Sequence, residues 1–250
     1  MSDNFPIPTP DRLPTKITPC PIVEAILEIR FVTSESWRTL PGLLYAKIRE
    51  RYPEQRDLSL AQLPEEIRRQ QVGFANLPLM QFLSSDFLVQ FGPRVVSLVT
   101  KPNSYPGWTA LEKEMTWLLA QLQECGFISE SERLGVRYIN FLPQNVFEQL
   151  ILSVTVSQHQ LTSGETSVTN VLRKKPFTAR LHVANSAILG SETDVRKGSV
   201  IDIDVWLGPL DFDLFTNELA KINEAHRFEK EIFFGLLKPE FLSSLAPAYE

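Results

Sequence analysis

Residues 19–31, with the sequence PCPIVEAILEIRF, decide how we interpret the rest of the chain. The last nine residues alternate between apolar and mostly polar side chains, which is the period of a β-strand with one buried face. The apolar set is Val23, Ala25, Leu27, Ile29 and Phe31, and the opposite set is Glu24, Ile26, Glu28 and Arg30. Because Pro19 and Pro21 lack the N–H group that a central strand donates, we expect strand pairing to begin after Pro21.

A second strand is predicted at residues 133–141, RLGVRYINF, where two arginines share one face. If this strand is an antiparallel neighbour of the first, Glu24 and Glu28 could meet Arg137 across the ladder. Such cross-strand pairs contribute roughly 0.2 to 1 kcal/mol each. They would fix the register and keep one face of the sheet solvated, or else line a polar groove.

Three segments carry a family resemblance: CPIVEAILEIRF, RLGVRYINFLP and, near the C-terminus, NELAKINEAHRFEKEIFFGLL. Together they resemble a sporadically distributed bacterial family of about this length that has no established function. The resemblance covers most of the chain in order. It implies a bacterial, cytoplasmic protein from mobile or defence-related gene neighbourhoods, and it supplies no catalytic residues.

The composition limits the class of protein. A chain of 250 residues can form one large domain or two small ones, and its net charge of -5 argues against general binding to phosphate backbones. Cys20 and Cys125 are far apart and outside any metal-binding spacing, so we expect reduced thiols. We find neither a run of 18 apolar residues nor a signal peptide, and therefore expect a cytoplasmic protein without a membrane partner.

The periodicity of the chain predicts an α+β protein with largely antiparallel sheets. We expect a ferredoxin-like N-terminal half and a second antiparallel sheet closed by a long C-terminal helix. The predicted domains are an extended proline-rich arm at 1–21, the ferredoxin-like half at 22–143, and the second sheet and helix at 144–250. The last two could also form one continuous domain.

The remaining expected elements follow from period and from turn residues. Residues 185–199, between two of the predicted strands, are polar and are expected to form a long mobile loop. The other elements are a helix that Ser36 can cap and that ends by Tyr52, helices at 58–70, 108–124 and 213–237, a hairpin of strands at 87–91 and 94–99, and strands at 151–157, 166–172, 177–184 and 200–207.

The arm and the end of the last helix are the predicted surfaces for protein partners. Phe5, Ile7 and Leu13 lie in a proline-rich segment too sparse in apolar residues for a packed element, so the arm either docks on another chain or is a disordered terminus. Phe233 and Phe234, with a further aromatic nearby, cover more than one face of the helix. We expect part of this helix to contact a second chain.

A catalytic site is not evident from motifs. The chain has no Walker loop, GxGxxG or GxSxG motif, and its three histidines lie outside metal-binding spacing, so we expect no cofactor and no metal. The strongest acid and base candidates are His182, Asp202 and Asp204, since two carboxylates two residues apart on a strand point the same way. They indicate a metal-dependent hydrolase as one alternative, or else a solvated strand face.

One basic cluster offers a different alternative. Arg173, Lys174, Lys175 and the nearby Arg180 could contact the backbone of RNA or DNA, although cations at the tip of a hairpin are often only solvated. Our first hypothesis is a non-catalytic protein-interaction or regulatory subunit, of a bacterial defence or toxin-linked system as the resemblance implies. Its partner would be another protein chain or a second copy. Enzymatic activity is left open, with the non-enzymatic interpretation preferred.

Overall fold

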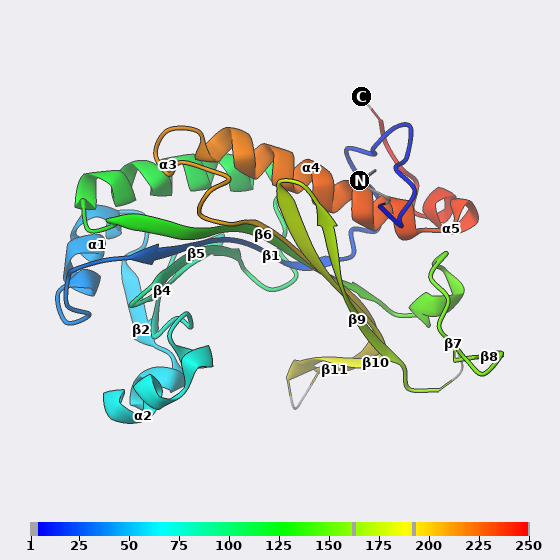
Figure 1. The fold of residues 1–250 in the computed structure, drawn as a ribbon, viewed down its shortest axis with the longest axis horizontal. Helices are drawn as coiled ribbons and strands as arrows, with labels where there is room; N and C mark the ends of the chain where they lie inside the picture. The colour runs from blue at the N-terminus through cyan, green and yellow to red at the C-terminus, as the bar shows by residue number, and fades with distance from the viewer. Residues whose placement is uncertain (1–4, 162–163, 192–193, 250) are drawn as a thin grey trace. The chain divides into compact units, whose positions relative to one another are not determined.

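The computed structural model describes residues 5–161, 164–191 and 194–249, and it confirms the predicted α+β class with mostly antiparallel strands. Over these residues the strands form a nine-stranded sheet in the order β2-β3-β4-β5-β1-β6-β11-β10-β9 and a small sheet of β7 and β8. Figure 1 shows the ribbon with these labels. In this part of the chain, no helix is both apolar and long enough to cross a membrane.

The chain divides into two compact units, each described here by itself. The first unit comprises Met1–Val23, Arg137–Val205 and Glu224–Glu250, and the second unit comprises Glu24–Val136 and Trp206–Asn223. Segments that are distant in the sequence therefore contribute to the same core.

The second unit contains the succession of strands and helices predicted for the N-terminal half. Its elements are β1 (Ile22–Val32), α1 (Leu40–Ile48), β2 (Glu54–Asp57), α2 (Glu65–Gln70), β3 (Met80–Leu83), β4 (Phe87–Gly92), β5 (Val95–Thr100), α3 (Trp108–Cys125) and β6 (Glu130–Leu142), the last of which continues into the first unit. Strand β1 pairs antiparallel with β5, with Leu27 opposite Leu98. Strand β2 and helix α2, with the adjoining β3, are inserted between α1 and the predicted hairpin β4–β5.

The predicted alternation of residues 23–31 is confirmed in β1 from Ala25 onward, whereas Val23 is only half-buried. Ala25, Leu27, Ile29 and Phe31 are fully buried, whereas the intervening positions are partly exposed. Helix α3 presents a stripe of buried side chains, Leu111, Met115, Leu118, Leu119 and Leu122. It ends where predicted, because Gly126 adopts a left-handed φ of 67° that favours glycine.

The first unit contains the C-terminal strands and most of the last long helix. Its elements are β7 (Thr155–Val156), β8 (His159–Gln160), β9 (Ser167–Lys174), β10 (Phe177–Ser191), β11 (Asp194–Leu207), α4 (Glu218–Leu236) and α5 (Pro239–Ser244), with the ends of β11 and α4 assigned to the second unit. Strands β9, β10 and β11 belong to the nine-stranded sheet rather than to a separate one. Ile201, Ile203 and Val205 of β11 are buried, but Asp202 and Asp204 between them are only 7% and 9% exposed, so the acidic face is not the solvated strand face considered from the sequence.

Two predictions about local structure in this unit are wrong. Most of the predicted loop at 185–199 is instead strand, because β10 continues to Ser191 and β11 begins at Asp194. Residues 192 and 193 of this predicted loop lie outside the described residues. The predicted strand at 151–157 is reduced to the two residues of β7, which pair only with β8. In both places the partner strand, which local sequence does not specify, decides whether a segment extends.

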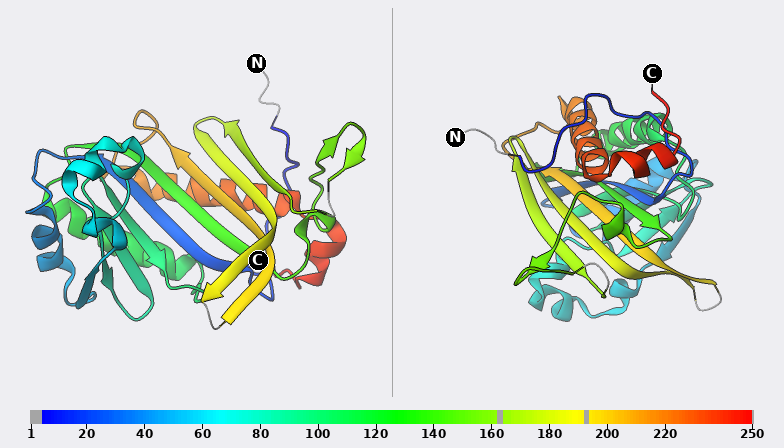
Figure 2. Two further views of the ribbon diagram at one scale, coloured as in Figure 1. Left: turned by 90° about the horizontal axis from the view of Figure 1, so that it is seen from below. Right: turned by 90° about the vertical axis from the view of Figure 1, so that its right-hand side faces the viewer.

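The N-terminal arm lies along α4 and α5 within the first unit (Figure 2). Lys16 pairs with Ala248 in an isolated antiparallel bridge, so the arm and the C-terminal tail are held together. The ring of Phe5 lies 5.3 Å from that of Phe228 on α4. The arm is thus packed against its own chain.

Candidate functional site

The acidic pair of β11 is held by arginines of neighbouring strands. Arg137 donates to both carboxylate oxygens of Asp202, at 2.8 and 2.6 Å, and Arg180 reaches Asp204 at 3.5 Å. Each carboxylate of this pair is thus bound by one arginine. In the second unit, Glu28 accepts from Arg133 rather than from Arg137 as we predicted.

The three residues considered for hydrolysis are placed on one sheet face but engage other partners. Nε2 of His182 lies 3.0 Å from Oγ of Ser167 on β9. Asp202 and Asp204 are each bound by an arginine. Among the described residues, no three His, Cys, Asp or Glu side chains gather in a group that could hold a metal ion.

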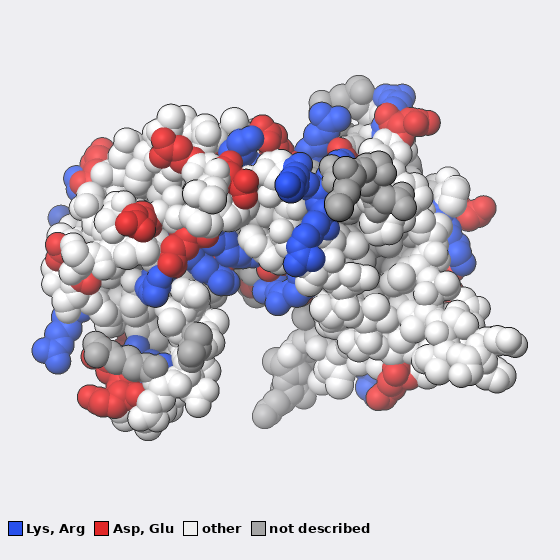
Figure 3. Space-filling view, in the orientation of Figure 1, with Lys and Arg blue, Asp and Glu red and all other residues white. Residues whose placement is uncertain are grey.

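The predicted basic cluster, Arg173, Lys174, Lys175 and Arg180, does not form one exposed group, because Lys174 is half-buried and its two neighbours are exposed. Lys174 donates to Glu231 of α4 at 2.8 Å and its ammonium lies 5.3 Å from the ring centre of Phe228. Arg173 and Lys175 remain exposed at the turn between β9 and β10. Both signs of charge appear on the face of the molecule seen in Figure 3. Lys174 therefore serves the packing of its own chain, and two of the four cations are bound to acids.

The residues proposed for partner binding are placed within the chain's own packing. Ile7 is 8% exposed, Phe233 is 5% exposed and Phe234 is 8% exposed, whereas Phe5 and Leu13 are partly exposed. The rings of Phe233 and Phe234 meet edge to face at 5.2 Å. Ile7, Phe233 and Phe234 are therefore largely inaccessible to a partner in this structure.

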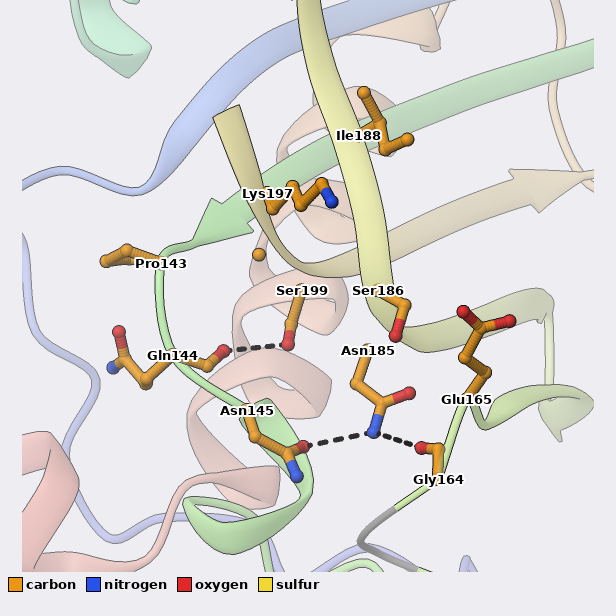
Figure 4. Close-up of a pocket in the computed structure, with 11 residues that line it drawn as sticks. Pro143, Gln144, Asn145, Gly164, Glu165, Asn185, Ser186, Ile188, Lys197 and Ser199 are labelled. Atoms are coloured by element: carbon orange, nitrogen blue, oxygen red, sulfur yellow. Dashed lines mark hydrogen bonds between the residues drawn. The ribbon is translucent and has the colours of Figure 1, made fainter. Parts of the chain in front are cut away.

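The structure also contains a pocket that sequence reasoning missed. It lies in the first unit, has a volume of about 630 Å³, and is open to solvent. One wall is the segment that follows β6, another is the segment before β9, and the rest is the hairpin of β10 and β11 (Figure 4). Its lining residues are Pro143, Gln144, Asn145, Gly164, Glu165, Asn185, Ser186, Ile188, Lys197, Gly198 and Ser199.

The floor of the pocket is fixed by internal hydrogen bonds. The side-chain amide of Asn185 donates to the carbonyl of Gly164 at 2.8 Å and accepts from the backbone N–H of Thr166 at 2.7 Å. Oγ of Ser199 donates to the carbonyl of Gln144 at 2.7 Å and accepts from the backbone N–H of Val146 at 3.0 Å. Since these groups already serve the fold, the floor is a support rather than a set of reactive groups.

The rim of the pocket carries exposed side chains of three kinds. Lys197 and Glu165 are exposed and of opposite charge, and Ile188 is 69% exposed. Ser186 adopts a φ of 73°, a left-handed conformation that is uncommon for serine and that redirects β10 at the pocket. No sequence motif predicts this pocket, because its lining comes from three segments that only the fold brings together.

Two titratable groups of α4 have strongly altered pKa values. Burial raises the pKa of Glu229 to about 8, although nearby Lys230 opposes the change. Burial also lowers the pKa of His226 to about 3, with a further contribution from Lys230. The ring of His226 lies 5.5 Å from that of Tyr138. Both groups are therefore uncharged at pH 7 within the folded chain.

The cysteines are both free, as predicted. Burial raises the pKa of the Cys125 thiol to about 11, and its sulfur lies 3.6 Å from the carbonyl oxygen of Leu43. A thiol with such a pKa is protonated at neutral pH and is a poor nucleophile.

Comparison of the chain with family models and with curated proteins gives no match.

Proposed function

We propose that the protein is a non-catalytic interaction or regulatory subunit that contacts other protein through the outer part of the β10–β11 hairpin. This distal hairpin consists of residues 186–190 and 195–199. The observation that carries the proposal is the exposure of two large apolar side chains on its neighbouring strands, Ile188 at 69% and Val195 at 54%. Apolar groups exposed together on a supported element favour a protein interface.

The edge of β10 adds a second support. The pairing of β9 with β10 ends where Ser167 faces Ala184, and β10 continues to Ser191 beyond this point. A strand edge that no neighbouring strand covers presents N–H and C=O groups to another chain. The distal hairpin thus combines backbone groups, which bind any extended segment, with apolar side chains, which select among partners.

Protein interaction is preferable to the two alternatives, a metal-dependent hydrolase and a nucleic-acid-binding protein, because the polar side chains that these alternatives need form ion pairs within the chain. Asp202 and Asp204 are bound by arginines, and Lys174 is bound by Glu231. A hydrolase would have to break the first two pairs, and a nucleic-acid site would have to rely on Arg173 and Lys175. The family resemblance would place the subunit in a bacterial, cytoplasmic defence or toxin-linked system.

The test is affinity capture of the tagged full chain from the cells that express it, with half of each eluate treated with nuclease. The wild type is expected to retain a stoichiometric protein partner after nuclease, and the double variant Ile188→Ser, Val195→Ser is expected to lose it. Leu210→Ser is the matched control, since Leu210 is 98% exposed and lies outside the hairpin. Equal capture by all three proteins, or recovery of nucleic acid alone, would contradict the proposal.

A further inference from the structure

We infer that the partner of the distal hairpin is a second copy of this chain, which pairs there through its own distal hairpin in an antiparallel, two-fold symmetric contact. The inference rests on the proposed function and names the occupant of the same surface. Three features of the first unit support it: the free edge of β10, the exposed apolar side chains, and the charges at the pocket rim.

The edge of β10 is suited to its own copy. Two identical strands that run antiparallel are related by a two-fold axis, and each exchanges the same backbone hydrogen bonds with the other. Within the described residues the uncovered stretch begins after Asn185, whose backbone N–H still donates to the carbonyl of Thr166. The side-chain hydrogen bonds of Asn185 fix the point at which β10 leaves β9. The left-handed Ser186 then turns the strand away from β9.

The charges on the rim are self-complementary. Lys197 and Glu165 line the same pocket, and within the described residues neither forms an ion pair. In a two-fold interface each contact occurs twice, so Lys197 of one copy can face Glu165 of the other and the reverse. A patch with one charge of each sign therefore attracts its own copy, whereas a patch with a single sign would repel it.

The pocket itself fits a protein segment better than a small molecule. Small-molecule sites are usually enclosed and largely apolar, with a few polar groups placed to orient the ligand. This pocket is open, and the polar groups of its floor are bound to backbone atoms of the same chain. A second hairpin would cover Ile188 and use the charged rim without needing the floor groups.

The experiment measures the mass of the full chain in solution by light scattering and by sedimentation over a range of concentrations. The wild type is expected to be a dimer. Lys197→Glu and Glu165→Lys should each raise the dimer dissociation constant by about tenfold or more, because like charges then face each other. Mixing the two variants should restore association as a heterodimer. The first variant carries an acid at both rim positions and the second carries a lysine at both, so each contact between the two chains again joins opposite charges.

The control is Lys175→Glu, which reverses an exposed lysine at the opposite end of β10 and should leave the dimer intact. Thermal melts of each variant show whether the fold is kept. A monomeric wild type, or a dimer that persists in both single variants, would overturn the inference. A monomer that still captures another protein through Ile188 would leave the proposed function standing, and a monomer that captures nothing would remove both.

Discussion

Arg137 holds Asp202 through two hydrogen bonds, from Nε to Oδ1 at 2.8 Å and from Nη2 to Oδ2 at 2.6 Å. Asp202 is 7% exposed, so removal of its partner would leave a nearly buried carboxylate. We expect Arg137→Met to lower the free energy of unfolding by about 2 kcal/mol, since a two-point pair to a buried acid is stronger than a surface pair. Urea denaturation at pH 7 measures the change.

Arg180→Met is the matched comparison, because Arg180 meets Asp204 through one longer contact of 3.5 Å and its side chain is 45% exposed. Its loss should cost less than about 1 kcal/mol. If the two substitutions cost the same, the two-point geometry has no special effect on stability.

The sequence alone predicted burial and helix ends correctly where these depend on a single strand or helix. Alternation along residues 23–31 predicted the buried side chains of β1 from Ala25 to Phe31, though not the half-buried Val23, and Gly126 marked the end of α3. Pairing between strands was harder to predict. We matched Glu28 with Arg137, yet Glu28 is bound by Arg133. These two arginines lie four residues apart on one face of β6, and neither strand's sequence alone specifies the register that selects between them.

The pocket was missed for a related reason. Residues 185–199 are polar and contain two glycines, which is typical of a loop, but residues 185–191 and 194–199 lie in the neighbouring strands β10 and β11. Likewise, Phe233, which we expected to meet a second chain, is only 5% exposed within its own fold. Apolar side chains that a sequence pattern assigns to a partner interface can instead be buried within their own chain.

Stability should depend on pH through Glu229 and His226. The pKa of Glu229 rises from 4.5 to about 8 on folding, so between these values the folded state keeps a proton that the unfolded state releases, and stability falls as pH rises. The pKa of His226 falls from 6.5 to about 3, so between these values the unfolded state binds an extra proton, and stability falls as pH decreases.

The two effects cancel between pH 4.5 and 6.5 and act alone outside that range. We expect a plateau there, a decline from pH 6.5 to 8 and a decline from pH 4.5 to 3, each with a slope of up to about 1.4 kcal/mol per pH unit. Glu229→Gln should remove the alkaline decline and exceed the wild type at pH 8 by at least about 1 kcal/mol. Thermal melts from pH 3 to 9 test this, and an unchanged alkaline slope in the variant would refute it.

Lys174 and Lys175 are neighbours with different roles. Lys174 donates to the nearly buried Glu231 and lies over the ring of Phe228, whereas Lys175 is exposed at the turn. We expect Lys174→Met to lower the free energy of unfolding by about 1 kcal/mol and Lys175→Met to change it by less than about 0.5 kcal/mol. Denaturant titration of both variants decides the matter, and equal effects would show that Lys174 has no structural role.

Gly235 of α4 is the contact point of the N-terminal arm. A Cβ atom at this position would lie 2.8 Å from Cγ2 of Ile7 and would collide with the carbonyl oxygen of Pro8. Gly235→Ala should therefore loosen the arm and cost about 1 kcal/mol or more in the full chain. Limited trypsin digestion should cleave after Arg12 or Lys16 faster in the variant than in the wild type.

The same substitution should change sign when the arm is absent. In a chain that lacks residues 1–10 nothing from Ile7 or Pro8 remains to collide with a Cβ, and alanine forms helix better than glycine by about 0.5 to 1 kcal/mol. Gly235→Ala should then stabilise the shortened chain, as measured by urea denaturation of the two shortened proteins. A destabilising effect of similar size in both backgrounds would mean that the arm does not rest on Gly235.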